Sequence, residues 1–256
     1  MHALVTGASA GIGEGLARAL AAAGYDLTLV ARRESELARV IGLLGDGRRA
    51  VPLVADLADL DAIPGVVARA AAGLGPIDVL VNNAGVQIIA RTEDVTVAEG
   101  ERLLRLNVFA AFRMTHAVLP DMLARKSGTI VDISSLAALA PTPGMFHYSA
   151  SKAALAAGSE ALRAEVKGRG VHVVTVYPGP VKTAMADAAL LRYEKDPMGA
   201  LPLGNTAELA RLVVAAIAKK RARVIYPRPY AVARMFPSLT RWAVDRFSPL
   251  PRSLKS

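Results

Sequence analysis

The sequence predicts a single α/β domain built on a doubly wound, parallel β-sheet with helices on both faces. Short runs nearly continuous in Val, Ile and Leu alternate along the chain with longer amphipathic stretches, as expected for strands covered by helices on both sides. The chain has 256 residues, 53% hydrophobic and 21% charged, so it is long enough for one large core and too apolar to be disordered. No linker and no internal repeat divides it.

The predicted elements alternate in order along most of the chain. Because strand, crossover helix and parallel strand connect with one handedness, this order gives a parallel sheet between two helical layers. The stretch 184–204 breaks the alternation and is rich in Ala, Met and Leu, so we expect a mobile insertion there. The expected strands are 2–6, 26–31, 50–55, 77–82, 128–134, 171–177 and 223–226, and the expected helices lie near 12–23, 34–44, 59–73, 96–126, 149–168 and 206–219.

The composition argues against several classes of protein. The chain has no cysteine, and its four histidines lack metal-ligand spacing, so neither a disulfide nor a metal site is expected. Ten of the 31 basic residues but only one of the 22 acidic residues lie in 219–256, so this tail carries the whole net charge of +9. The neutral body gives no indication of nucleic-acid binding. No basic leader or membrane-spanning helix is expected, and the lack of cysteine suits a reducing cytoplasm, so a cytoplasmic location is expected.

A glycine-rich turn follows the first predicted strand. In "TGASAGIG" (6–13), Gly7, Gly11 and Gly13 lie between a strand and a helix. Small residues let the backbone approach a pyrophosphate, and the helix amino terminus offers free N–H groups and a favourable dipole. Glycine-rich turns are common, but this one opens the first βα unit and a second strand follows at the expected distance. We therefore predict a dinucleotide site here.

The end of the second predicted strand indicates which dinucleotide binds. An acidic residue at this place accepts the ribose 2′-hydroxyl of NAD, whereas arginine accommodates the 2′-phosphate of NADP. In "VARR" (30–33) Arg32 and Arg33 follow Ala31, and no carboxylate comes before Glu34. The alternative is a solvated helix start, which cations do not favour. We predict NADP as the cofactor.

The stretch "FHYSASKAAL" places a phenol one helical turn before an ammonium group. Tyr148 and Lys152 are four residues apart, so on a helix they share a face. A neighbouring cation lowers the pKa of a phenol, and such a pair can act as a general acid or base near neutral pH. From these residues alone, an incidental polar pair on a surface helix remains the alternative.

Five motifs together resemble the short-chain dehydrogenase/reductase family. They are TGASAGIG (6–13), NNAG (82–85), DISS (132–135), YSASK (148–152) and YPGPVKT (177–183), in the family's order and at its intervals. The resemblance covers about residues 2–226. It implies a Rossmann-like sheet of about seven strands and reversible hydride transfer between a nicotinamide and a carbonyl or alcohol.

The resemblance also implies roles for individual residues. Tyr148 is expected to be the proton donor or acceptor, and Lys152 its modulator. The serine thirteen residues before Tyr148 is Ser135, which is expected to bind the substrate oxygen, and Asn107 matches the family's helix-interrupting asparagine. The expected cofactor contacts are Gly7, Ser9, Gly11, Ile12, Gly13, Arg32, Arg33, Asp56, Leu57, Asn83, Ala84, Gly85, Tyr148, Lys152, Pro178, Gly179, Val181 and Thr183.

Each of these roles has a structural alternative. Ser135 can simply end its strand by bonding the backbone, and Asn107 can be an ordinary polar residue of a helix. Asp56 can cap the next helix instead of contacting adenine. His147 lies beside the tyrosine, but adjacent helical side chains point in different directions, so we do not expect it to act as the base.

The activity that follows is an NADP(H)-dependent oxidoreductase acting on a small carbonyl or alcohol. Ala184, Met185, Leu190, Leu191 and Met198 make the 184–204 lid apolar, which favours a lipophilic substrate, although such residues also simply pack. The alternatives are a non-catalytic NADP-binding sensor or scaffold, and an isomerase or dehydratase on the same fold. A homodimer or homotetramer is expected, since helices at 96–126 and 149–168 commonly form subunit faces in this family.

The catalytic domain is expected to span 1–228, followed by a basic amphipathic extension, 229–256. Ser238 is placed to cap a helix that Pro249 ends, with Leu239, Trp242, Ala243 and Phe247 at helical spacing. One interpretation is packing across the subunit's own cleft or on a neighbouring subunit. The other is peripheral contact of 238–249 with an anionic membrane, because apolar residues with Trp among cations are typical of interfacial helices.

Overall fold

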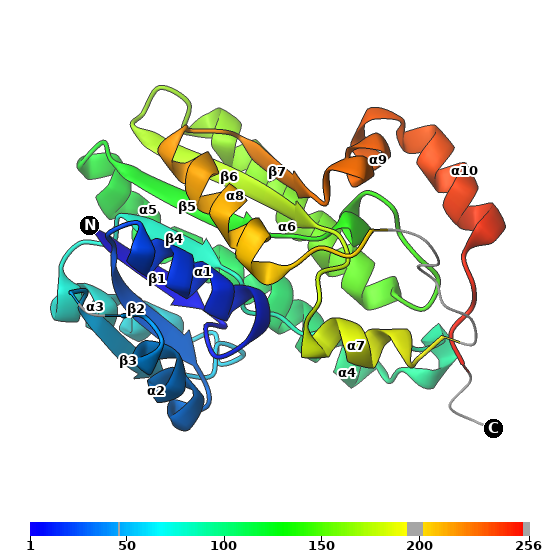
Figure 1. Cartoon of the computed structure of the whole chain (residues 1–256), viewed down its shortest axis with the longest axis horizontal. Coiled ribbons are helices and arrows are strands. Elements are labelled where there is room, and N and C mark those ends of the chain that lie inside the picture. The colour runs from blue at the N-terminus through cyan, green and yellow to red at the C-terminus, as the bar shows by residue number, and fades with distance from the viewer. Residues whose placement is uncertain (46, 194–201, 253–256) are drawn as a thin grey trace.

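The computed structural model describes residues 1–45, 47–193 and 202–252 of the chain. Its centre is a parallel sheet with the strand order β3-β2-β1-β4-β5-β6-β7 (Figure 1). This confirms the predicted doubly wound, Rossmann-like fold with seven strands. The strands are β1 (His2–Thr6), β2 (Asp26–Ala31), β3 (Ala50–Val54), β4 (Val79–Asn82), β5 (Gly128–Ile133), β6 (Val171–Pro178) and β7 (Arg223–Tyr226).

Helices cover the sheet on both faces, as Figure 1 shows with α1 and α8 in front of the strands and α5 behind them. Two hydrophobic cores result, one packed under α1, α2 and α8 and the other under α3 and α5. The main helices are α1 (Gly11–Ala22), α2 (Glu34–Gly42), α3 (Ile63–Leu74), α4 (Val97–Leu104), α5 (Ala111–Ala124), α6 (Phe146–Glu165), α7 (Ala184–Leu190), α8 (Thr206–Ala218), α9 (Val232–Met235) and α10 (Pro237–Phe247). Short 3-10 turns lie at Thr92–Asp94, Leu136–Ala138 and Arg228–Ala231.

The strands form where the apolar runs are continuous. Every residue of β1 is buried, and β6 is buried at all but one position, because each strand contacts a neighbour on both sides and a helix on both faces. Parallel pairing aligns Val5 with both Leu29 of β2 and Val81 of β4. The carboxyl ends of the strands therefore lie along one edge, where loops can gather side chains into a site.

Three predicted boundaries differ in the structure. The helix predicted at 96–126 is three elements, because a π-helical turn, Arg105–Ala110, separates α4 from α5. The helix predicted at 59–73 starts only at Ile63, after a tight turn. Part of the stretch predicted as a mobile insertion is the helix α7, and 194–201, with Met198, lies outside the described residues.

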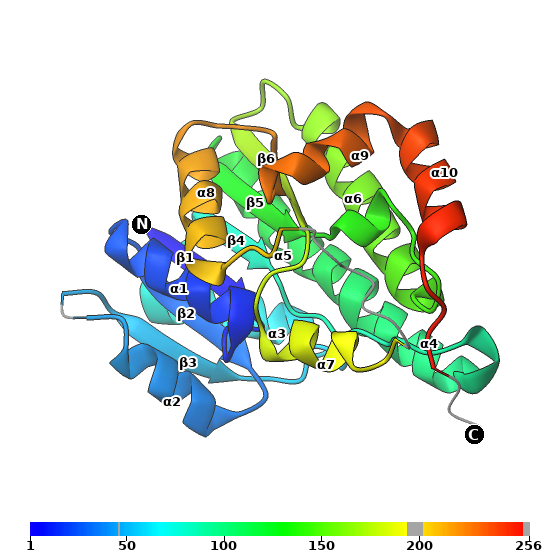
Figure 2. The same ribbon diagram turned by 45° about the vertical axis from the view of Figure 1, so that its right-hand side comes forward.

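The C-terminal extension lies beyond β7, at the carboxyl end of the sheet. Figures 1 and 2 show α10 at the margin of the molecule, joined to the body through α9 at one end and, at the other, through a segment that passes α7 and α4. The predicted cap at Ser238 is wrong. The helix already begins at Pro237, whose fixed φ suits a first helical position, and its N-cap residue is Phe236 without a side-chain bond.

Candidate active site

The glycine-rich turn is shaped for close approach of a ligand backbone. Gly7 has a φ of +64°, and a Cβ there would lie 2.9 Å from the Cα of Ala84. A Cβ on Gly13 would collide with the carbonyl of Gly7, so α1 can start this close to β1 only with glycine at that position. No side chain caps the first turn of α1, since its N-cap residue is Ala10. The uncapped N–H groups fit a pyrophosphate.

A hydrogen-bond network joins this turn to the residues after β4. The hydroxyl of Thr6 donates to the carbonyl of Val81 and accepts the N–H groups of Asn83 and Ala84 at 2.9 and 3.0 Å. The Asn83 amide in turn donates to the carbonyls of Thr6 and Gly7, at 2.9 and 3.2 Å. These hydrogen bonds hold the ends of β1 and β4 together, which is the sheet-stabilising role expected for the NNAG turn.

Helix α6 carries the tyrosine and lysine into the same cleft. Lys152 Nζ lies 5.9 Å from the centroid of the Tyr148 ring, so the two side chains do share a face. Lys152 is buried, with 5% of its surface exposed, and its Nζ donates to the carbonyl of Ile133 at 2.9 Å. The Ser134 hydroxyl donates to the Lys152 carbonyl at 2.8 Å and fastens α6 to the end of β5.

The buried ammonium of Lys152 is electrostatically sensitive. Burial lowers its pKa from 10.5 to about 8, while the negative charge of Asp132 raises it. The Asp132 carboxylate is itself buried and accepts a hydrogen bond from the Asn82 amide at 2.8 Å. Its pKa is raised by burial and lowered by its hydrogen bonds to Asn82 and Ser159 and by the charge of Lys152.

The phenol of Tyr148 differs from the sequence-based expectation. Burial raises its pKa above the usual 10, and the hydrogen bond with Ser135 acts in the opposite direction. The lowering predicted from the neighbouring ammonium is not found in this state, because loss of water around the phenol outweighs it. A protonated Tyr148 is suited to donate a proton.

The π-helical turn positions Asn107. Its amide oxygen accepts the N–H of Val86 at 2.9 Å, and its amide nitrogen donates to the carbonyl of Val86 and the hydroxyl of Ser151, at 2.9 and 3.0 Å. A Cβ on Gly85 would lie 3.1 Å from the Asn107 oxygen and 3.5 Å from Lys152 Nζ. Asn107 therefore interrupts its helix and adjoins the lysine. π-Turns are frequently found at functional sites.

Ser135 and Ser134 have different environments. The Ser135 oxygen accepts the N–H of Ala137 at 3.1 Å, which leaves its hydroxyl proton for another partner, and the hydroxyl also bonds with Tyr148. Ser134 is buried, and its hydroxyl proton is already donated to Lys152. The structure thus brings Ser135, Tyr148, Lys152 and Asn107 together at the carboxyl ends of β4 and β5.

The arginines expected to select the cofactor lie at the outer end of the glycine-rich turn. Arg32 and Arg33 are both exposed after β2, and Arg33 is the N-cap residue of α2. The nearby Arg39 donates to the carbonyl of Ser9 at 3.3 Å and pairs with Glu14 at 2.7 Å. The guanidinium of Arg39 is thus paired within the chain, whereas Arg32 and Arg33 are exposed residues that follow β2.

The predicted adenine contacts follow β3. The Asp56 carboxylate accepts the N–H of Ala58 at 3.0 Å and closes a tight turn. It does not cap α3, whose N-cap is Ala62, so the structural alternative for Asp56 is a turn cap. Leu57 is buried with the second core, while Ile12 of α1 packs against the first.

The segment after β6 approaches the glycine-rich turn from the other side. A Cβ on Gly11 would lie 3.5 Å from the Thr183 methyl group, so these two segments face each other across the strand ends. Gly179 N–H donates to the carbonyl of Tyr226 at 2.6 Å, Val181 is buried, and the Thr183 hydroxyl caps α7. Pro178, at the end of β6, pairs with Tyr226 of β7.

Some candidates lie away from the cleft. His147 packs edge-on against the Phe146 ring and contacts Gly100 of α4, so its side chain is engaged outside the reacting centre. Within the described residues no group of His, Asp and Glu is arranged to hold a metal ion. No helix of the described residues is long and apolar enough to span a membrane.

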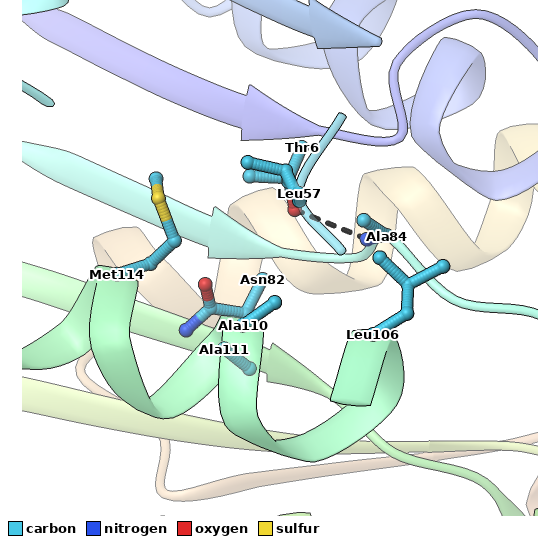
Figure 3. Close-up of a pocket in the computed structure, with 8 residues that line it drawn as sticks. All are labelled: Thr6, Leu57, Asn82, Ala84, Leu106, Ala110, Ala111 and Met114. Carbon is cyan, nitrogen blue, oxygen red and sulfur yellow. Dashed lines mark hydrogen bonds between the residues drawn. The ribbon is translucent and has the colours of Figure 1, made fainter. Parts of the chain in front are cut away.

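Two hollows accompany the site. One, of about 10 Å³, lies beside Thr6, Ala84 and Asn82 and is large enough for a single water (Figure 3). The amide oxygen of Asn82, which lines it, is buried without a protein partner. The other measures about 320 Å³ between α7 and the segment after β4, which suits part of a small ligand. It is lined by Gln87, Ile88, Ile89, Ala90, Asp94, Val95, Glu99, Met185, Ala188, Ala189 and Arg192.

A Rossmann-like sheet with a glycine-rich turn after β1 is typical of dinucleotide-binding proteins. The family model described as short chain dehydrogenase matches residues 1–193, and the chain belongs to this family. A short chain dehydrogenase from Pseudocercospora fijiensis (strain CIRAD86) is 36% identical over 203 residues, which are 77% of this chain and 65% of the relative.

Two further similarities bear on the chemistry. A fatty acyl-CoA reductase from Acinetobacter baylyi (strain ATCC 33305 / BD413 / ADP1) is 36% identical over 226 residues, 87% of this chain and 74% of the relative. The crystal structure of a substituted actinorhodin polyketide ketoreductase with NADPH superposes with a TM-score of 0.82 at 29% identity, covering 88% of this chain and 95% of that one.

The sequence did not indicate two residues that position or tune Asn107 and Lys152. The Ser151 hydroxyl accepts from the Asn107 amide and donates to the carbonyl of Tyr148, and nothing in YSASK singles this serine out. Asp132, the first residue of DISS, is the buried carboxyl that raises the pKa of Lys152. A charged residue inside an otherwise apolar strand was the signal that could have identified Asp132.

Proposed function

We propose that the protein is an NADP(H)-dependent oxidoreductase that interconverts a carbonyl and an alcohol by hydride transfer. The observation that carries the proposal is the convergence of Ser135, Tyr148, Lys152 and Asn107 beside Gly85. The glycine-rich turn and the uncapped start of α1 fit the pyrophosphate of the cofactor. When bound, the cofactor supplies a hydride to the carbonyl carbon in the reducing direction.

The chain's own residues handle the oxygen and the proton. Tyr148 donates its phenolic proton to the carbonyl oxygen, and Ser135 donates a hydrogen bond to the same oxygen while negative charge develops there. The ammonium of Lys152 stabilises the phenolate left behind. Asn107 keeps the π-turn and Lys152 in place through its bonds to Val86 and Ser151.

The test of this proposal is NADPH oxidation with a panel of ketones, aldehydes and quinones. Tyr148→Phe is expected to abolish turnover and to leave NADPH binding within a few-fold, since only the proton donor is lost. Ser135→Ala is expected to lower kcat about 10²–10³-fold, as for loss of one oxyanion donor. Ser134→Ala is the matched control and should be mild. More than a tenth of the kcat remaining in Tyr148→Phe would contradict the proposed acid, and reversed serine effects would contradict the assignment of Ser135.

NADP is favoured over NAD by Arg32 and Arg33 and by the absence of an acidic residue at position 31. The similar polyketide ketoreductase was solved with NADPH, which supports the same choice.

A lipophilic substrate is favoured by the hollow of about 320 Å³ beside the cleft. Ile88, Ile89, Val95 and Met185 give it apolar walls, and the charged residues Asp94, Glu99 and Arg192 also line it. The similarity to a protein named fatty acyl-CoA reductase supports the same class of substrate. We expect kcat/KM to rise with substrate chain length until this hollow is filled.

The remaining parts of the proposal concern partners and place. The catalytic unit, 1–228 with its lid at 184–204, is expected to act in the cytoplasm as a homodimer or homotetramer. The extension, 229–256, would bring it to a membrane periphery, where a lipophilic substrate dissolves.

A further inference from the structure

The C-terminal extension displays large apolar side chains to solvent. Five of them form what we call the lipid-docking surface of α9 and α10. Burial of such side chains is the main favourable term in folding, so their exposure at one place needs a partner. Their exposed fractions are 69% for Met235, 54% for Phe236, 55% for Leu239, 59% for Trp242 and 68% for Phe247.

The exposed side of α10 is distinct from the side that it turns to the body. Thr240, Ala243 and Val244 are partly covered, whereas Leu239 and Trp242 point outward on adjacent turns. No residue of α10 is buried. Trp242 and Phe247 stack edge to face with ring centroids 5.8 Å apart, so the exposed rings form one cluster.

The amino-terminal end of this extension is firmly anchored. Arg234 of α9 donates to both oxygens of Glu160 at 3.0 and 3.3 Å, and Arg223 donates to the same carboxylate at 2.8 and 2.7 Å. Tyr177 also donates to Glu160, at 2.7 Å, and Ala233 of α9 packs with Tyr177 in a small hydrophobic core. The extension is therefore attached to α6, the helix that carries Tyr148.

The carboxyl-terminal end is anchored at the mouth of the cleft. Arg252 N–H donates to the carbonyl of Arg192 at 2.8 Å, Arg91 donates to the carbonyl of Pro251 at 3.3 Å, and Pro251 pairs antiparallel with Tyr193 after α7. The ring of Pro251 lies against Gly144 in the turn before Tyr148. Both ends of α10 are thus fixed, and its largest apolar side chains, Leu239, Trp242 and Phe247, remain exposed.

The charges of this segment select the partner. Between 228 and 252 the chain has five arginines and a single carboxylate, Asp245. Arg241 and Arg246 are exposed on α10 itself, and the guanidinium of Arg246 lies 5.6 Å from the centroid of the Phe247 ring. Apolar side chains including Trp and Phe with cations beside them fit the headgroup region of an anionic bilayer.

We propose that the lipid-docking surface inserts into the interface of an anionic membrane and places the mouth of the cleft near the acyl chains. This inference rests on the proposed location at a membrane periphery and specifies the surface that makes the contact. It does not depend on the proposed catalytic activity. Because the segment after α10 covers the turn at Gly144 beside α7, docking of α10 brings this entrance to the membrane. A lipophilic substrate could then enter without crossing bulk water.

The experiment uses the only tryptophan of the chain, Trp242, as a built-in probe. The full chain is mixed with phosphatidylglycerol/phosphatidylcholine vesicles or with phosphatidylcholine alone, at low and high salt. With the anionic vesicles at low salt we expect cosedimentation, a blue shift of the emission and quenching by brominated acyl chains. All three should weaken at high salt and with neutral vesicles.

Variants separate the surface from the rest of the molecule. Leu239→Ser and Phe247→Ser should each weaken partitioning about ten-fold or more, as expected from the apolar area withdrawn from lipid. Arg241→Gln should weaken it about five-fold, with anionic vesicles only. Val97→Ser, at an apolar position of α4 that is 75% exposed, is the matched control and should leave partitioning unchanged. NADPH turnover of every variant, measured without vesicles, reports on the proposed activity separately.

Two outcomes would overturn the proposal. One is a full chain that stays in the supernatant with anionic vesicles at low salt while its Trp242 emission is unchanged. The other is a blue shift without vesicles that grows with protein concentration and disappears in Leu239→Ser, because the surface would then be a contact between copies of this chain.

Discussion

At the scale of single residues, the chemistry depends on what surrounds two ionisable groups. Lys152 and Tyr148 share one helical face, but burial acts on them in opposite senses. It lowers the pKa of the ammonium and raises that of the phenol, since loss of water disfavours the charged form of each. Asp132, on the strand beneath α6, partly restores the charged form of Lys152.

The pH profile should reveal this dependence. With a Lys152 pKa of about 8, the ammonium is present below that pH and lost above it, so kcat/KM for carbonyl reduction should fall as the pH rises through about 8. Asp132→Asn removes the negative charge that raises the pKa of Lys152, so this alkaline limb should move to lower pH. The measurement is kcat/KM from pH 6 to 10.

A matched variant tests whether this effect is electrostatic. Thr175→Val removes a buried hydroxyl that bonds Ser159, in the same network but without a charge. It should reduce stability and leave the limb in place. An unchanged limb in Asp132→Asn, in a protein that remains folded, would show that Asp132 has no electrostatic role.

Cofactor choice is also a property of single residues. Arg32→Ala should raise the KM for NADPH about ten-fold or more, because hydrogen bonds to charged groups contribute ~1.5–3 kcal/mol, and should leave NADH nearly unaffected. Steady-state kinetics with both cofactors measures this. Arg18→Ala is the control, because Arg18 is also an exposed arginine but lies on α1. Equal effects of Arg32→Ala on both cofactors would mean that Arg32 does not contact the 2′-phosphate.

At the scale of elements, the π-turn determines where Asn107 lies, and the C-terminal extension is held to the body by a few specific contacts. The π-turn holds Asn107 against Val86 and Ser151, which an uninterrupted α-helix would place differently. The extension depends on Glu160, because this one carboxylate joins α6, β6, β7 and α9 through Tyr177, Arg223 and Arg234.

The Glu160 contacts make stability dependent on acid. Hydrogen bonds from Arg223 and Tyr177 and the nearby guanidinium charges lower the Glu160 pKa from 4.5 to about 2. This stabilisation is fully present above pH 4.5 and is lost as the pH falls through about 2. Glu160→Gln should therefore lower the free energy of unfolding by roughly 2 kcal/mol at neutral pH.

Urea unfolding of the two proteins at several pH values is the measurement, and their difference should shrink from pH 4.5 downward. Glu208→Gln is the control, since its partner Arg211 is mostly exposed and such pairs contribute little. A difference between Glu160→Gln and the unchanged protein that stayed constant across this range would contradict the assigned role of the ion pairs.

At the scale of the whole molecule, the proposed site and the C-terminal extension lie at the same end of the sheet. The parallel sheet collects every proposed catalytic and cofactor-binding loop at the carboxyl ends of its strands, and the C-terminal extension lies at this same end (Figure 1). The exposed Arg241 and Arg246 of α10 thus lie at the same end of the sheet as the proposed cleft. Residues 1–218 are neutral overall, and residues 219–256 carry the whole net charge of +9.

The sequence by itself determined the fold and most of the candidate site. Continuous apolar runs specify strands buried on both faces, and glycines such as Gly7 and Gly13 are the only residues that their backbone geometry accepts, so both appear as local patterns. The spacing of Tyr148 and Lys152 is likewise a local property of one helix. Ser135 and Asn107 belong to motifs that follow successive strands. Because the carboxyl ends of parallel strands lie at one edge of the sheet, the order of the motifs predicted that these residues meet Tyr148 and Lys152.

Only the tertiary structure decided the properties that depend on contacts between distant segments. The pKa of Tyr148 was predicted with the wrong sign, because burial by other segments exceeds the effect of a neighbour four residues away. Asp132, Ser151 and the anchors of the extension at Glu160 and Tyr193 join residues remote in the chain, so no local pattern encodes them. Local periodicity predicts an amphipathic helix at α10, but which of its apolar residues are covered, as Ala243 and Val244 are in part, and which are exposed, as Leu239 and Trp242 are, depends on how α10 packs on the body.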